Sequence, residues 1–204
     1  MILKPRHRRG FLFFFLQILN FDKMEFETIH TERLTLRKLT PEILAFIYEN
    51  YEKDEIKVML GLDTDEDYTR DRNKSLGGYT TYRSTMVQFK IVDNASGVVI
   101  GAAGFHNWYA EHSRAELGYV LTKEEFKNKG IMTEAVSAIL EYGFTTMNLE
   151  RVEAFTSPSN EPSIKLLKKF NFTQEGYIRK RYFYDGKLED SPVFGLLKEE
   201  YKPR

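Results

Sequence analysis

The sequence contains no cysteine among its 204 residues. This absence excludes disulfide bonds, a thiolate nucleophile and zinc sites with cysteine ligands. The formal net charge is zero, so no overall field favours nucleic acid. No basic stripe with interleaved aromatic residues occurs after residue 23. A nucleic-acid partner is therefore not expected, and the lack of cysteine suits a cytoplasmic protein.

Metal-binding patterns are also missing. The four histidines, His7, His30, His106 and His112, show no i, i+4 spacing and no cluster of Asp or Glu, so no metal site is expected. The turn at residues 127–135 has a single glycine and no Gly-Lys-Ser/Thr ending, which excludes a Walker-type nucleotide loop.

Residues 1–23 differ in kind from the rest of the chain. Basic residues between positions 4 and 9 precede an apolar run at residues 11–19, as in a signal or membrane-anchor segment. The run is about half of the ~20 residues that a membrane-spanning helix needs, and no small-residue cleavage site follows it. The alternative is a start at Met24, with residues 1–23 as a poorly packed leader. We favour this alternative, and a membrane partner is not expected.

The rest of the chain, residues 24–204, is predicted to form one domain. The sequence is 42% hydrophobic and 14% aromatic, which suffices for a single packed core. Strands are predicted at residues 33–39, 86–92, 98–105, 114–121, 151–156, 175–184 and 187–197. Helices are predicted at residues 41–51, 65–82, 131–147 and 159–170. Asn171 is a candidate left-handed helix cap, and Asp185-Gly186 predicts a hairpin turn.

The stretch from Lys127 to Ala135 joins a predicted strand to the long predicted helix. The first N–H groups of such a helix lack internal partners, and with the helix dipole they form a site for phosphate. Gly130 has no Cβ to keep a ligand away and can take a positive φ. Lys127 and Lys129 add positive charge. The alternative is an ordinary strand-to-helix connection without a ligand.

This stretch resembles a known family motif. Lys127-Asn-Lys-Gly-Ile-Met132 is similar to the Gln/Arg-x-x-Gly-x-Gly/Ala loop with which GNAT-superfamily acetyltransferases hold the pyrophosphate of acetyl-CoA. The flanking phrases, Ala115-Glu-Leu-Gly-Tyr-Val-Leu121 and Thr133-Glu-Ala135, look like the Rim-type branch that acetylates ribosomal proteins at their N-termini. Lys127 replaces Gln or Arg and keeps a charged donor, whereas Met132 replaces Gly or Ala and adds bulk.

The resemblance implies an α/β fold over about residues 31–200. This GNAT fold has a mixed, mostly antiparallel sheet of about seven strands flanked by four helices, with strands splayed at the cofactor site. It implies an acyltransferase that moves the acetyl group of acetyl-CoA to an amine, here the α-amine of a protein N-terminus. The alternatives are a small-molecule amine such as a polyamine, or a CoA-binding module without turnover. The oligomeric state stays open, with a homodimer as one option.

The resemblance also implies which residues bind the cofactor. The backbone of the 119–121 segment would pair with the pantetheine arm, and the 127–133 loop would hold the pyrophosphate. Asn160 would hydrogen-bond the arm, because Asn160-Glu-Pro-Ser163-Ile-Lys-Leu-Leu167 resembles the Asn-x-x-Ser-x-x-Leu motif of this branch. The full set of cofactor candidates is Tyr119, Val120, Leu121, Lys127, Asn128, Lys129, Gly130, Ile131, Met132, Thr133, Asn160 and Ser163.

Ser163 is the candidate acid that protonates the departing thiolate. Many GNAT enzymes use a tyrosine seven residues after the Asn, but this chain has Leu167 there. The alternative for Asn160 is helix capping, and the alternative for Ser163 is a side chain that merely faces water.

Glu116 and His106 are the candidates for the general base. Alternation places Glu116 on the same strand face as Gly118 and Val120. A carboxylate there could accept the amine proton if burial raised its pKa towards 7, or it could only orient the acceptor. A histidine has a pKa suited to this task, although His106 could also be a simple loop-edge residue. Glu134 is expected only to complement the helix dipole.

Overall fold

The computed structural model describes residues 25–78, 84–184 and 186–203. The expectations for the leader at 1–23, the end of the second predicted helix at 79–82 and the turn residue Asp185 lie outside this range.

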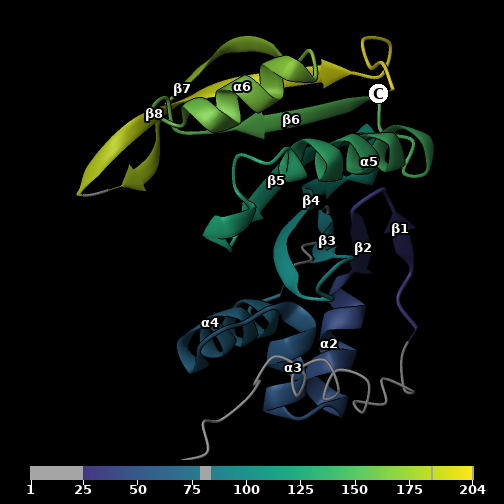
Figure 1. Cartoon of the computed structure of the whole chain (residues 1–204). Helices are drawn as coiled ribbons and strands as arrows, with labels where there is room; N and C mark the ends of the chain where they lie inside the picture. Colours follow the sequence, from purple (N-terminus) through teal and green to yellow (C-terminus); the bar gives the residue numbers. More distant parts are fainter. Residues whose placement is uncertain (1–24, 79–83, 185, 204) are drawn as a thin grey trace, which may run out of the picture.

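The described residues form one eight-stranded sheet with the order β1-β2-β3-β4-β5-β6-β8-β7 (Figure 1). Every neighbouring pair is antiparallel except β5 and β6, which are parallel. This mixed, mostly antiparallel sheet confirms the predicted fold class. The strands are β1 (Thr28–His30), β2 (Leu34–Leu39), β3 (Thr85–Asp93), β4 (Val99–Tyr109), β5 (Arg114–Leu121), β6 (Arg151–Phe155), β7 (Thr173–Tyr184) and β8 (Lys187–Leu197).

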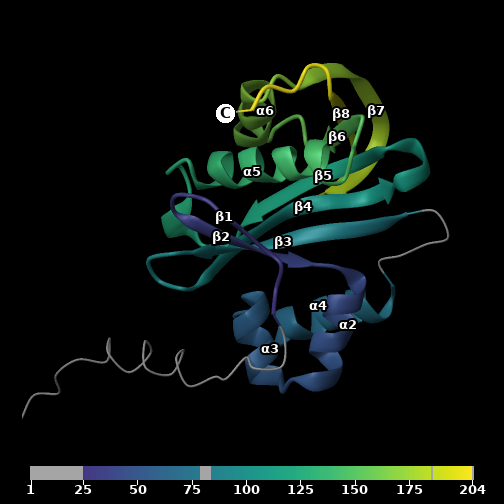
Figure 2. The ribbon, with the colours of Figure 1, turned by 90° about the vertical axis from the view of Figure 1, so that its right-hand side faces the viewer.

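Helices cover both faces of this sheet. Helices α5 and α6 lie on one side, and α2, α3 and α4 form a group on the other (Figures 1 and 2). The five helices of the described residues are α2 (Pro41–Asn50), α3 (Lys53–Leu60), α4 (Asp65–Leu76), α5 (Ile131–Thr145) and α6 (Glu161–Lys169).

The alternation of β3 separates two hydrophobic cores. Phe89 and Ile91 belong to the larger core, which α5 and α6 complete. Met86 points the other way and packs with Leu44 and Ile56 of the α2–α4 group. Because successive side chains of a strand point to opposite faces, even-numbered residues of β3 face α2–α4 and odd-numbered ones face α5.

One strand and one α-helix of the described residues were not predicted from the sequence. β1 has only three residues and pairs with β2 through Ile29 and Leu36. α3 begins with a capping box between Glu52 and Glu55 and ends at Gly61 in the left-handed conformation, so its eight residues are helical. The described part of the chain therefore has one strand and one α-helix more than the sequence predicted.

The end of β4 corrects another prediction. The strand was expected to stop at Phe105, with a loop from Asn107 to Ser113, but it continues to Tyr109. A break in register between His106 and Tyr109 allows this, and Asn107 takes a positive φ of 47° there. The irregularity turns the Asn107 side chain towards β5. Elsewhere, the predicted left-handed cap at Asn171 is confirmed by its φ of 63°.

Candidate active site

Strand β5 has an open edge in the middle of the sheet. It pairs with β6 only from Arg114 to Glu116, opposite Arg151 to Glu153. Among the described residues, the segment from Leu117 to Leu121 has no ladder partner on that side. The two strands therefore diverge at the place where the cofactor arm was expected.

A cavity of about 510 Å³ lies along this open edge, between β5, the start of α5 and the start of α6. The residues predicted to contact the cofactor all line it, except Lys129, and we call it the cofactor cavity after this prediction. Met132 lines the cavity and also packs partly against the larger core. The structure thus brings the two separate sequence motifs to one place.

The start of α5 has two features that were predicted for a phosphate site. Gly130 precedes the helix with a φ of 75°, and no side chain caps the first turn. A Cβ at Gly130 would come within 4 Å of one side-chain atom only, Nη2 of Arg33 at 3.7 Å, so the approach to the first N–H groups is open. Lys127 forms an ion pair with Glu124 and lies at the surface.

Glu134 has more contacts than the sequence suggested. Its carboxylate accepts hydrogen bonds from Thr31 Oγ1 at 2.6 Å, from the Arg33 backbone N–H at 2.8 Å and from Arg33 Nε at 2.7 Å. Arg33 Nη1 also donates to the carbonyl of Lys129 at 3.0 Å. Burial alone would raise the pKa of Glu134, but these bonds lower it. Glu134 and Arg33 therefore fix the loop in front of α5 to the beginning of β2.

Ser163 lies beside a tyrosine at the cofactor cavity. Its Oγ is 2.7 Å from the hydroxyl of Tyr119, whose side chain is partly buried. Burial raises the pKa of Tyr119, although the hydrogen bond to Ser163 opposes this, so the phenol keeps its proton at neutral pH. Asn160 Oδ1 accepts from the backbone N–H of Ser163, which is the helix-capping role given as its alternative.

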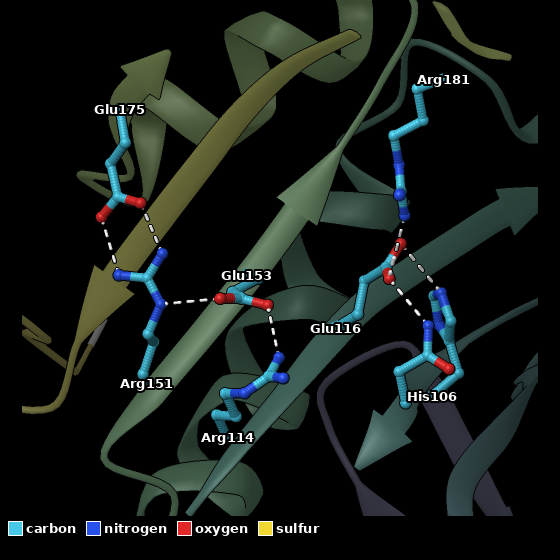
Figure 3. A network of polar contacts seen from close by, with 8 residues as sticks. His106, Arg114, Glu116, Arg151, Glu153, Glu175 and Arg181 are labelled. Carbon is cyan, nitrogen blue, oxygen red and sulfur yellow. Dashed lines mark hydrogen bonds and ion pairs between the residues drawn. The ribbon is translucent and has the colours of Figure 1, made fainter. Parts of the chain in front are cut away.

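Glu116 and His106 form a pair on the opposite face of β5 (Figure 3). Nε2 of His106 is 3.0 Å from Oε1 of Glu116. Nδ2 of Asn107 donates to Oε2 at 3.0 Å, and Nη2 of Arg181 is 3.6 Å from the same atom. Asn107 and Arg181 were not identified from the sequence, because a strand irregularity and a distant hairpin bring them here.

The pKa of Glu116 shifts in the direction opposite to that required of a base. Burial alone would raise it, but the hydrogen bonds from His106 and Asn107 and the charges of His106 and Arg181 lower it below its ordinary value. The condition set for Glu116 to act as the base, a pKa raised towards 7, is therefore not met. The ionised carboxylate stays in contact with Nε2 of His106.

The ring of His106 lies over Gly118. A Cβ added at Gly118 would be 3.0 Å from Cε1 and 3.1 Å from Nδ1 of that ring. The absence of a side chain at Gly118 therefore leaves room for the imidazole. Nε2 faces Glu116, and Nδ1 remains on the side of the ring that lies over β5.

A second cavity, of about 440 Å³, lies between β3–β5 and the α3–α4 segment. Val120 lines both this cavity and the cofactor cavity. β5 thus separates the two spaces, with His106 and Glu116 on the α2–α4 side and Tyr119 and Ser163 on the α5–α6 side.

Two further findings concern ligands and membranes. Within residues 25–78, 84–184 and 186–203, no three His, Asp or Glu side chains are grouped as a metal site would need. None of the described helices combines the length and apolar character needed to cross a membrane.

Comparison with known proteins identifies the family. Residues 33–173 match the acetyltransferase (GNAT) domain. An uncharacterized N-acetyltransferase, p20 of Bacillus licheniformis, is 37% identical over 177 residues, which cover 86% of this chain and 98% of that protein. The spermidine N(1)-acetyltransferase of Escherichia coli K12 is 28% identical over 90 residues, covering 44% and 48%. The crystal structure of a GNAT-family acetyltransferase from Bacillus anthracis matches with a TM-score of 0.60 and 29% identity, over 85% of this chain and 100% of that one. The chain therefore belongs to the GNAT family of acyltransferases, whose domains use acetyl-CoA as co-substrate.

Proposed function

We propose that this protein acetylates the α-amine of a protein N-terminus, in a ternary complex with acetyl-CoA. The observation that carries the proposal is the pair of cavities that meet at Val120, with one candidate proton-transfer pair on each side of β5. The acceptor class is supported by the resemblance of the Ala115–Leu121 and Asn160–Leu167 phrases to the Rim-type branch. The cysteine-free composition supports a cytoplasmic location.

His106 is the proposed base. Glu116 holds Nε2, so Nδ1 over Gly118 can accept a proton from the ammonium group of the acceptor. The neutral amine nitrogen then attacks the thioester carbon. A new C–N bond forms, and backbone N–H groups on the free edge of β5 near Tyr119 and Val120 stabilise the developing oxyanion.

Ser163 is the proposed acid. When the C–S bond breaks, the sulfur takes the proton of the Ser163 hydroxyl, and Tyr119 donates its hydrogen bond to the oxygen that remains. As the amide forms, the nitrogen passes its second proton to the Ser163 oxygen and restores the hydroxyl, while the first proton leaves from His106. One proton in total passes to solvent, so the reaction yields an amide and free CoA thiol in balance.

The test measures free thiol while acetyl-CoA is mixed with one acceptor at a time. The acceptors are peptides that begin with serine or alanine, the same peptides blocked at the N-terminus, and spermidine. We expect thiol release with the free peptides and none with the blocked ones. Faster turnover of spermidine would make a polyamine the acceptor, which is the second candidate that the Escherichia coli relative favours. Tight acetyl-CoA binding without thiol release from any amine would indicate a binding module.

A further inference from the structure

The cavity on the α3–α4 side contains a buried lysine. Lys90 is only 9% exposed and lines the cavity from β3. Its even number places it on the face towards α2–α4, as for Met86. Among the described residues, its ammonium group makes no hydrogen bond and no ion pair. A lysine is rarely buried without a partner, because desolvation of the charge is costly.

A second cation lies beside Lys90. Arg37 of β2 is its direct partner in the ladder, so both side chains project from the same face. Arg37 has no ion pair within the described part of the chain, and its guanidinium lies 5.9 Å from the ring centre of Phe26. Burial lowers the pKa of Arg37. Like charges opposite each other destabilise a sheet. An anion bound beside Lys90 and Arg37 would therefore reduce the repulsion between them.

The carboxylates around the cavity already have partners of their own. Asp63 binds Lys123 at 2.6 Å, and Asp67 binds Thr64 and Arg70. Asp71 accepts a hydrogen bond from the hydroxyl of Tyr48 at 2.6 Å.

Asp71 acts on Lys90 only through its charge and not through a hydrogen bond or ion pair. Burial lowers the pKa of Lys90, and the charge of Asp71 offsets this only in part. The protein itself therefore supplies no carboxylate in contact with the ammonium group.

We propose that Lys90 binds a carboxylate of the acceptor and so selects acidic N-terminal segments. The proposal rests on the function proposed above. Lys90, Ala102 and Val120 lie opposite one another on three adjacent strands. Two strand spacings of about 4.8 Å give about 10 Å between the Cα atoms at the ends of this row.

This distance sets the length of the acceptor. An extended peptide advances by about 3.3 Å per residue. The reacting amine lies at His106 over Gly118, two residues from Val120 on the same face of β5. From there, an acidic side chain at the second or third residue reaches Lys90. The neighbouring Arg37 adds positive charge at the far end of the row.

The first experiment uses the unaltered protein. Amidated peptides that begin Ser-Glu or Ser-Ala-Glu are compared with the matched Ser-Gln and Ser-Ala-Gln peptides, so that the only difference is one carboxylate. A charge-assisted hydrogen bond predicts a KM at least about tenfold lower for the better-placed acidic peptide. The dipeptide Ser-Ala with a free carboxyl end, compared with its amide, shows whether a terminal carboxylate serves equally.

The second experiment replaces the lysine. Lys90→Met keeps the length of the side chain and removes its charge, whereas Lys198→Met removes a remote surface charge as the control. We expect Lys90→Met to raise the KM of the acidic peptide about tenfold and to leave that of the Gln peptide and of acetyl-CoA unchanged. Its Tm should be equal or higher, because a desolvated charge is lost. A purely structural lysine would lower the Tm and affect both peptides alike.

The outcomes separate the two proposals. Equal KM values for the Glu and Gln peptides would overturn the Lys90 site and leave N-terminal acetylation intact. A preference for spermidine over every peptide would overturn both. Loss of the acidic preference in Lys198→Met as well would also contradict the role of Lys90. No turnover of any peptide would refute the proposed function itself.

Discussion

Glu116 is held by three groups from two different places in the sequence. His106 and Asn107 come from β4, Arg181 from β7, and all three stabilise the ionised carboxylate. A group whose pKa is lowered by folding stabilises the protein above its unfolded pKa, and this contribution is lost as the pH falls through the lowered folded value. The structure therefore predicts an acid-sensitive contribution from Glu116.

We expect Glu116→Gln to lower the free energy of unfolding by about 1–3 kcal/mol at pH 7, since a buried charged acceptor is lost. The difference from wild type should shrink as the pH falls below about 4.3, the ordinary value for glutamate. Thermal unfolding between pH 3 and pH 7 measures this. The control is Glu199→Gln. Glu199 is exposed, and among the described residues its side chain has no hydrogen bond or ion pair. A difference that stays constant over the whole range would contradict the assignment.

Tyr119 and Ser163 act as one unit in the proposed mechanism. Tyr119→Phe keeps the ring and removes the hydroxyl that lies 2.7 Å from Ser163. We expect kcat to fall about tenfold, as for one lost hydrogen bond in the transition state, with little change in the KM for acetyl-CoA.

The double variant tests this coupling. If Tyr119 acts through Ser163, adding Tyr119→Phe to Ser163→Ala should cost no more than Ser163→Ala alone. Steady-state kinetics of the wild type, the two single variants and the double variant gives the double-mutant cycle. Additive losses would show that the tyrosine acts by another route.

The sequence identified Ser163 and Glu116 as candidate site residues, but it did not indicate which side chains contact them. The Asn-x-x-Ser phrase placed Ser163 at the cleft, while Tyr119 was expected to contribute only its backbone. The two residues are 44 positions apart, and no local pattern joins them. The sequence also could not indicate that the pKa of Glu116 is lowered, since Arg181 and the irregular strand at Asn107 reach it only through the folded sheet.

The first turn of helix α5 forms the proposed phosphate site. Arg33 and Glu134 hold the preceding loop, while Gly130 keeps it open. We expect Gly130→Glu to weaken acetyl-CoA binding at least about 100-fold, because a side chain at positive φ is strained and a negative charge repels the pyrophosphate. Calorimetric titration with CoA measures this.

The matched control for this helix is Gly97→Glu. Gly97 also has a positive φ, of 69°, and an added Cβ there meets no atom within 4 Å. It lies in the turn before β4, outside both cavities. Equal losses of CoA affinity in the two variants would show that backbone strain, and not the phosphate site, explains the effect.

Long periodic elements were predictable and short ones were not. β5, β8 and the starts of α2 and α5 lie where the sequence placed them. β1 was missed because three residues are too few for an alternation to be visible. α3 carries a mixed sequence whose helix depends on its capping box. The prediction of β4 failed at a bulge, which periodicity alone does not indicate.

At the scale of the whole molecule, strand order was the part that local patterns left undetermined. The hairpin of β7 and β8 was predicted from Asp185-Gly186, but the choice of β8 as the neighbour of β6 depends on contacts across the sheet. The parallel pairing of β5 and β6 likewise follows from the crossover through α5. The family resemblance anticipated only that β5 and β6 diverge at the cofactor site.

An ion-pair network holds the sheet together where it divides (Figure 3). Glu153 of β6 binds Arg114 of β5 at 3.0 Å and Arg151 at 2.9 Å, and Arg151 also binds Glu175 of β7. The hydrogen bonds to Glu175 are the main reason why the pKa of Arg151 is raised. These contacts join β5, β6 and β7 at the closed end of the divergence, so the open end can remain free for a ligand.

The two cavities share a single residue, Val120, and otherwise draw on different parts of the chain. In the proposed function, the cavity at α5 and α6 takes the acyl donor, and the cavity at α3, α4 and the even-numbered side of β3 takes the acceptor. Substitutions in one cavity can consequently be made without disturbing the other. Engineering of amine selectivity would therefore begin with α3, α4 and the row through Lys90, while the donor-binding machinery is kept as it is.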